Sequence, residues 1–420
     1  MRVPFRDLGA QGRLNLLLTA IAGFYLTLAA YYLTLAGVVF APVGLDFMVF
    51  WSAGYVANFM GYDRIYDLDL LTKVQVAFAP VLKQLRSPHP FFSLPVLILP
   101  FQAFALLPPA LSFLLWSFLN LLVLVLYLAF FARKASVSSR GLLVMLLLSF
   151  PVFCNFFWGQ VNVWLVICVG EFMRALWEDR PWKAGAWLAG LLLKPQTLVL
   201  ILPALVLARK FRVIVGFVLT FLALLLLSWL ISGPEGFKGM LSLWLKAGTY
   251  GFETGVECMM NWRALGMYLD ALVFPLGRVV AGFGMAFTAA LVLYLWVGFR
   301  PRDEKAISIP LLGTIAGTMA FTWHSHYHTA MLLLPPLISL AGVMPSRLMR
   351  AWVLAPPVTL FMVYVTGALF VLAGGTLPES FGCPIFLVLF LVLHLWLLLW
   401  AVEQKRKAIG SQADAQACWG

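Results

Sequence analysis

The chain has few charged residues. Only 11% of its 420 residues are Asp, Glu, Lys or Arg, whereas 63% are hydrophobic. Soluble domains contain about 25% charged and about 45–50% apolar residues, so this composition excludes an ordinary soluble domain. The apolar residues form long unbroken runs, which indicate spanning helices and not the short alternating strands of a membrane barrel. We therefore expect an all-α polytopic membrane protein.

Cysteine is also scarce. The five cysteines show neither a zinc-ligand spacing nor a paired pattern. From this we predict no disulfide framework, no metal centre and no cofactor. The cysteines are Cys154, Cys168, Cys258, Cys383 and Cys418.

Acidic residues are fewer than basic ones, 17 against 29, which gives a net charge of +12. A positive balance can indicate nucleic-acid binding, but here the basic residues lie in short clusters between apolar runs. The positive-inside rule explains that arrangement, so we expect membrane lipids as partners and no nucleic acid. The clusters predicted to be cytoplasmic are 174–183, 209–212, 300–305, 347–350 and 405–407.

The hydropathy pattern predicts the organisation of the chain. A first span at 14–39 places the following segment, 43–90, on the outer side as the first outer loop. The rest of residues 1–404 forms a single integral-membrane domain with 11–13 membrane segments, and 405–420 is a cytoplasmic basic end and tail. Both termini are expected in the cytoplasm, in a multi-pass protein of the cell membrane.

Two parts of this outline need a closer reading. Stretches near 47–60 and 68–85 mix apolar and polar residues at helical spacing, so we expect amphipathic interfacial helices in the first outer loop. Prolines divide 91–131 into two apolar pieces. Either one piece is re-entrant, or the following basic pair Arg133-Lys134 is external.

Asp46 is the most unusual residue of the first outer loop. It lies directly after the first span, where a carboxylate is costly to keep unless it has a function. Its structural alternative is an N-cap for the helix expected at 47–60. A catalytic role and a capping role both remain open for Asp46.

Other polar residues come from separate loops on the same predicted side, as an active site built on helices requires. Lys194, alone between two apolar runs, either meets a phosphate or extends to the membrane surface. For His324, His326 and His328 we favour a phosphate contact by one imidazole over a metal site, because the loop has no Cys or carboxylate to complete a coordination sphere. The remaining candidates are Arg64, His89, Gln160, Asn162, Glu257 and Asn261.

Several segments together resemble the motifs of glycosyltransferase family 87. The first runs from Asp46-Phe47 to Tyr66-Asp67, and the second is Gly159-Gln160-Val161-Asn162. The similarity extends over residues 40–340. The other similar segments are Pro88 to Phe91, Ala186 to Pro195, Met260 to Arg263 and His324 to His328.

The resemblance implies a helical bundle of the GT-C type and a polyprenyl-phosphate sugar donor, with mannose as the common sugar. It implies inverting transfer to a lipid or glycan acceptor at the outer face, with Asp46 as the base. Lys194, Arg64 and the three histidines are then candidates for the donor phosphate. His89, Gln160, Asn162, Glu257 and Asn261 are candidates for the acceptor or the sugar.

The residue types agree with that chemistry. Glycosyl transfer needs a base for the acceptor hydroxyl and cations for the departing phosphate. A retaining enzyme would need a second carboxylate nearby. Two alternatives are a transporter or flippase for lipid-linked sugars, which would place its polar groups at mid-membrane, and a ligase joining lipid-linked glycans, which an Arg-rich outer loop would favour.

Overall fold

The structure is a computed structural model, and it describes residues 10–34, 44–79, 90–137, 140–247, 255–298, 304–377 and 380–417. All regular elements in these residues are helices, which confirms the all-α class. Six helices are long and apolar enough to cross a membrane. They are α1 (Ala10–Thr34), α5 (Pro109–Lys134), α11 (Phe211–Ala247), α13 (Leu276–Trp296), α16 (Ser346–Leu372) and α17 (Cys383–Ala417).

Shorter helices connect and pack against these six. They are α2 (Leu45–Phe59), α3 (Leu68–Phe78), α4 (Leu99–Phe104), α6 (Arg140–Leu147), α7 (Phe150–Trp158), α8 (Asn162–Trp177), α9 (Pro181–Ala189), α10 (Ile201–Leu207), α12 (Trp262–Leu272), α14 (Ser308–Phe321) and α15 (Leu334–Ser339). The 3₁₀ turns are η2 (Tyr62–Arg64), η4 (Pro95–Ile98), η5 (Gly190–Leu193), η6 (Pro195–Leu198), η7 (Val256–Cys258), η8 (Glu304–Ile307) and η9 (Tyr327–Leu333).

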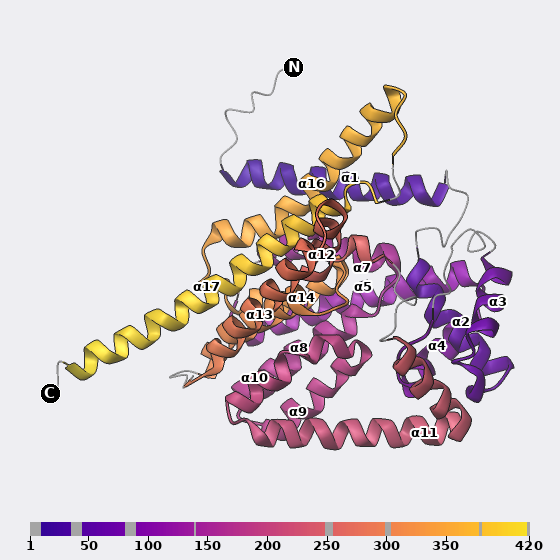
Figure 1. Cartoon of the computed structure of the whole chain (residues 1–420), viewed down its shortest axis with the longest axis horizontal. Coiled ribbons are helices and arrows are strands. Elements are labelled where there is room, and N and C mark those ends of the chain that lie inside the picture. Colours follow the sequence, from indigo (N-terminus) through magenta and orange to yellow (C-terminus); the bar gives the residue numbers. More distant parts are fainter. Residues whose placement is uncertain are drawn as a thin grey trace.

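The described residues contain fewer full-length spans than the 11–13 segments expected. Helices α6 and α7 form one bent pair with an angle of 49°, and three further apolar helical stretches are shorter than 18 residues. Proline is the main physical reason, because it removes a backbone donor and ends or bends a helix. In α11, Gly233 has a positive φ of 67° directly before Pro234, and the helix axis turns there, as Figure 1 shows near the right end of α11.

The stretch 91–131 contains one short apolar helix and one long one. The apolar helix from Pro95 to Phe104 is short. At about 1.5 Å per residue it covers roughly half of a hydrocarbon core about 30 Å thick. Helix α5 is long enough to cross a membrane alone, with Arg133 and Lys134 in its last turn, and these lengths favour the re-entrant alternative.

The two helices expected in the first outer loop are present. Helix α3 is amphipathic and buries Leu71 and Val74. Helix α2 is instead enclosed on most sides, because Phe47 and Trp51 are fully buried in an aromatic cluster. A Cβ on Gly54 would lie 2.5 Å from the carbonyl oxygen of Phe101, so glycine is needed where α2 meets α4.

The prediction of no disulfide was wrong. Cys258, in η7, is bonded to Cys383, the first residue of α17, with 4.8 Å between the two Cα atoms. The partners are 125 residues apart in sequence, so no local spacing could reveal the pair. Cys154 and Cys168 are free and buried, and Cys418 lies outside the described residues. Helix α17 continues to Ala417, so most of the predicted tail, 405–420, is helical.

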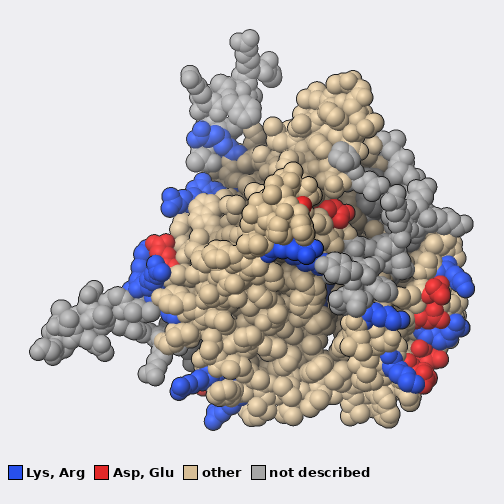
Figure 2. Space-filling model, in the orientation of Figure 1, with Lys and Arg blue, Asp and Glu red and all other residues tan. Residues whose placement is uncertain are grey.

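Charged side chains gather at two edges of the molecule. In Figure 2, Lys and Arg predominate along the left edge, where Figure 1 draws the end of α17 and the start of α11. Acidic and basic side chains are mixed along the right edge, beside α2 and α3. Most of the surface between the two edges is made of other residues, apart from one group of basic and acidic side chains near the middle of the view. A mostly apolar surface between two charged edges, of which the left edge is the more basic, is the distribution expected of a multi-pass membrane protein.

Candidate active site

The start of α2 places Asp46 beside the end of α7. The amide of Gly44 donates to the carbonyl of Phe157 over 2.8 Å, and a Cβ on Gly159 would lie 2.5 Å from the Cβ of Phe47. Gly44 is the N-cap of α2, with φ 76°, and Asp46 lies in the first turn without capping the helix. The capping alternative for Asp46 is therefore wrong.

Gln160 contacts Asp46 directly. Gly159 is the C-cap of α7, and its left-handed φ of 74° turns the chain so that Gln160 contacts Asp46 of α2. The Nε2 of Gln160 donates to an Asp46 carboxylate oxygen over 2.6 Å. A hydrogen bond to a charged acceptor is about twice as strong as a neutral one, so this bond fixes the carboxylate. The Oε1 of Gln160 is buried without a hydrogen-bond partner among the described residues.

Two residues farther along, Asn162 begins α8 and holds His328. Its Nδ2 lies 3.0 Å from Nδ1 of His328 and donates to the His328 carbonyl over 3.2 Å. The Nζ of Lys194 lies 3.4 Å from the same Nδ1. Because both neighbours are donors, Nδ1 is the acceptor and the ring proton is on Nε2.

Lys194 joins these two contacts. It lies between η5 and η6, where Pro195 begins the second turn. Burial lowers the pKa of Lys194 to about 7, and the negative charge of Asp46 partly opposes that shift. Lys194 therefore connects the Asp46 carboxylate to the histidine segment electrostatically, and it changes charge near neutral pH.

The three histidines form a row. The ring centroids of His324 and His326 are 4.8 Å apart, and those of His326 and His328 are 5.8 Å apart. Burial, together with the charge of Lys194, lowers the pKa of His326 to about 4 and the pKa of His324 and His328 well below its usual value. The row is neutral at pH 7. In the described chain, no group of three or more His, Cys, Asp or Glu side chains could hold a metal ion.

Residues 255–261, which precede α12, cover the histidine row. The amide of Met260 donates to the carbonyl of Ser325 over 2.9 Å, and the Arg263 guanidinium donates to the carbonyl of Trp323 over 3.3 Å. Gly255 has φ 68°, and a Cβ there would lie 3.4 Å from the His326 ring. The disulfide at Cys258 connects this loop to α17. The loop therefore has a fixed position over the histidines.

Two candidates in that loop have different surroundings. The backbone carbonyl of Glu257 accepts from the Tyr268 hydroxyl over 3.1 Å, which joins Glu257 to α12. Asn261 is fully buried. Its side chain caps α12 by accepting from the amide of Ala264 over 2.9 Å. Asn261 therefore fixes the junction between this loop and α12.

Arg64 is not brought to Asp46. It lies in η2, beyond the far end of α2, and that helix of 15 residues spans about 22 Å at 1.5 Å per residue. Arg64 is half-exposed and pairs with Asp67 over 3.3 Å. His89 lies outside the described residues.

The sequence reading missed Asn155. Its side-chain oxygen accepts from the amide of Asn162 over 3.2 Å and so caps the start of α8. Its Nδ2 is buried with no hydrogen-bond partner in the described part of the chain. An amide inside the apolar run of α7 was the available signal, because buried amides need partners.

The fold and this site define a polytopic membrane enzyme with one carboxylate beside a lysine and a histidine row. The family model for Glycosyltransferase family 87 matches residues 90–322, which is more than half of the chain. The chain belongs to Glycosyltransferase family 87, and it is a membrane glycosyltransferase with lipid-linked substrates. The family decides against the transporter alternative. No curated protein and no solved structure matches the chain.

Proposed function

We propose that the protein transfers a sugar from a polyprenyl-phosphate donor to a lipid or glycan acceptor at the outer face of the membrane, with inversion. One observation carries the proposal. The Asp46–Gln160 pair and the Lys194–His328–Asn162 group, from distant parts of the chain, meet at one place. The proposal takes Asp46 as the base and Lys194 as the phosphate-binding cation, in a member of a glycosyltransferase family.

In the proposed reaction, the Asp46 carboxylate accepts the proton of the acceptor hydroxyl. The hydroxyl oxygen then forms the new bond to the anomeric carbon, and the bond from that carbon to the donor phosphate breaks. The electron pair leaves with the polyprenyl phosphate. Gln160 keeps the Asp46 carboxylate in the orientation for proton transfer, because it holds one of its oxygens at 2.6 Å.

The departing phosphate needs positive charge and hydrogen-bond donors. Lys194 supplies the charge, and a bound phosphate raises the fraction of Lys194 that is protonated. The Nε2 proton of His328 offers a neutral donor beside it, because Nδ1 is held by Asn162 and Lys194. Asp46 alone supplies the carboxylate in this proposal, and a direct displacement needs no second one.

The disulfide supports action at the outer face. Disulfides persist in oxidising compartments outside the cytoplasm. The Cys258–Cys383 bond lies in the loop that covers the histidine row, so the row and the disulfide share one side of the membrane. The basic run 405–407 lies beyond the apolar part of α17 from Cys383, which agrees with that orientation.

The test is transfer by the purified protein. Polyprenyl-phosphate mannose with a labelled sugar is incubated with the enzyme and a membrane lipid extract, beside matched glucose and arabinofuranose donors. We expect the label in an acceptor product with the mannose donor, and with inverted configuration at the anomeric carbon. No transfer from any polyprenyl-phosphate sugar, or retention of configuration, would overturn the proposal.

A further inference from the structure

A second polar site lies away from the cluster around Asp46. A cavity of about 320 Å³ lies between the turn that joins α8 to α9 and the turn that joins α10 to α11. Both turns contain a non-glycine residue with positive φ, Asp179 at 47° and Arg209 at 54°. The cavity is about 20 Å from Lys194 along α9 and η5, at about 1.5–2 Å per residue. It is therefore not part of the proposed active site.

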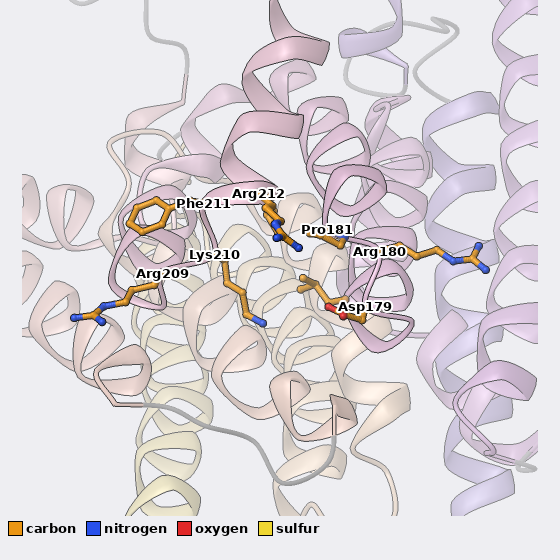
Figure 3. A pocket seen from close by; sticks show the side chains of 9 residues that line it. Asp179, Arg180, Pro181, Arg209, Lys210, Phe211 and Arg212 are labelled. Atoms are coloured by element: carbon orange, nitrogen blue, oxygen red, sulfur yellow. The ribbon is translucent and has the colours of Figure 1, made fainter.

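The lining of the cavity carries an excess of positive charge. Figure 3 shows Lys210 and Arg212 between the two turns, with Arg209 and Arg180 directed away on opposite sides. Arg180 pairs with Glu178 over 3.3 Å. Among the described residues, Lys210 and Arg212 have no ion-pair partner, and Asp179 is the single acidic residue of the lining. An anionic group would offset this charge.

An apolar surface begins at the mouth of the cavity. Phe211 lines the cavity and is 57% exposed. Exposed residues continue from it along one side of α11 at helical spacing. They are Val215, Leu219, Leu222, Leu226 and Leu230. Helix α11 is a candidate span from Phe211 to Lys246, so this exposed apolar stripe is available to lipid. Trp182, exposed at the start of α9, is of the type that anchors helices at the interface.

We propose that this cavity binds the headgroup of an anionic phospholipid of the cytoplasmic leaflet. Lys210 and Arg212 contact the phosphate, and the acyl chains lie along the stripe on α11. Basic pockets between transmembrane helices on the cytoplasmic side bind such headgroups. Free phosphate would share the charge contacts, but it has no use for the apolar stripe that continues from the cavity. If Lys210 and Arg212 served only to orient the protein in the membrane, neither the cavity nor the apolar stripe would be needed.

The bound lipid also holds two packed helices. A Cβ on Gly185 of α9 would lie 2.1 Å from the carbonyl of Val213 in α11, so the backbones of these helices are in close contact. A headgroup in the cavity would contact the first residues of both α9 and α11. We therefore expect lipid binding to raise the thermal stability of the protein.

The test compares two double variants of the full-length protein. Lys210→Gln with Arg212→Gln removes the two cations of the cavity. Arg347→Gln with Arg350→Gln removes the same charge from another cluster of the basic edge and is the matched control. Each protein is placed in nanodiscs of phosphatidylcholine containing one fifth phosphatidylglycerol. Phosphatidylglycerol that stays bound is counted by native mass spectrometry after release into detergent.

We expect the cavity variant to bind phosphatidylglycerol about 10–30-fold more weakly than the wild type, with the control within threefold of the wild type. The wild type should also melt at a higher temperature with phosphatidylglycerol than with phosphatidylcholine alone. Equal losses in both variants, or no loss in either, would overturn the proposal. Displacement of phosphatidylglycerol by millimolar inorganic phosphate would identify a free-phosphate site instead and would equally overturn it.

Discussion

Lys194 gives the sharpest test of the electrostatics of the site. Its pKa of about 7, lowered from 10.5 by burial, means that donor-free enzyme loses the lysine charge just above neutral pH. At one unit above the pKa about one tenth of the molecules keep the charge. If the charge binds the donor phosphate, kcat/KM for the donor falls about tenfold per pH unit above pH 7. Arginine stays charged at these pH values, so Lys194→Arg should remove the alkaline limb.

The assay is the initial rate of transfer from pH 6 to pH 9 at donor concentrations far below KM. The neighbouring groups are Asp46 and the three histidines. The histidine pKa values lie below their usual range, so these residues stay neutral across the alkaline limb. A flat wild-type profile above pH 7, or the same limb in Lys194→Arg, would refute the reasoning. Lys194→Met should lose about 10²–10³-fold at pH 6, and its difference from the wild type should shrink as the pH rises to 9.

As the pH rises above 7, the contribution of Lys194 to the stability of the fold should increase while the activity falls. The folded pKa of Lys194 lies below the unfolded value, so the unfolded chain binds more protons between pH 7 and pH 10.5. This group therefore makes the folded state more stable as the pH rises through that window. Thermal unfolding at each pH separates the loss of a charge from the loss of the fold.

Three further changes test other contacts. Gln160→Ala should lower kcat about tenfold and leave the donor KM unchanged, because the lost bond orients Asp46; a change confined to KM would contradict the positioning role. The double variant Cys258→Ser with Cys383→Ser should lower the free energy of unfolding by about 2–5 kcal/mol in thermal denaturation. A wild-type melting temperature that is the same in reducing and oxidising buffer would show that the disulfide contributes nothing. Asn261→Ala should cost about 1 kcal/mol of stability through the lost cap of α12, and a loss of donor affinity without a loss of stability would assign Asn261 to the substrate instead.

The sequence carried the class of protein and the candidates for its central residues. Composition and apolar run length determine a helical membrane protein, because lipid permits few other backbones. Asp46 and Lys194 stood out because charged groups are costly beside apolar segments. Their meeting could not be derived, since it depends on how α2, α7 and η5 pack. The segments that resembled glycosyltransferase family 87 indicated the right family.

The features that could not be predicted from local sequence have a common physical origin. The Cys258–Cys383 bond and the separation of Arg64 from Asp46 are set by packing between residues far apart in sequence. Asn261 matched a pattern for substrate binding, yet it caps a helix, because a buried amide can satisfy either role. Local periodicity predicted helices well, and it could not show that α2 is enclosed on most sides.

The central claim is that Asp46 is the base of sugar transfer. The direct measurement is the turnover of Asp46→Asn with a labelled polyprenyl-phosphate sugar, beside Asp69→Asn, which makes the same change at an exposed position of α3. We predict that Asp46→Asn loses about 10²–10⁴-fold in kcat with its melting temperature kept, while Asp69→Asn turns over like the wild type. An Asp46→Asn enzyme with wild-type turnover would contradict the account.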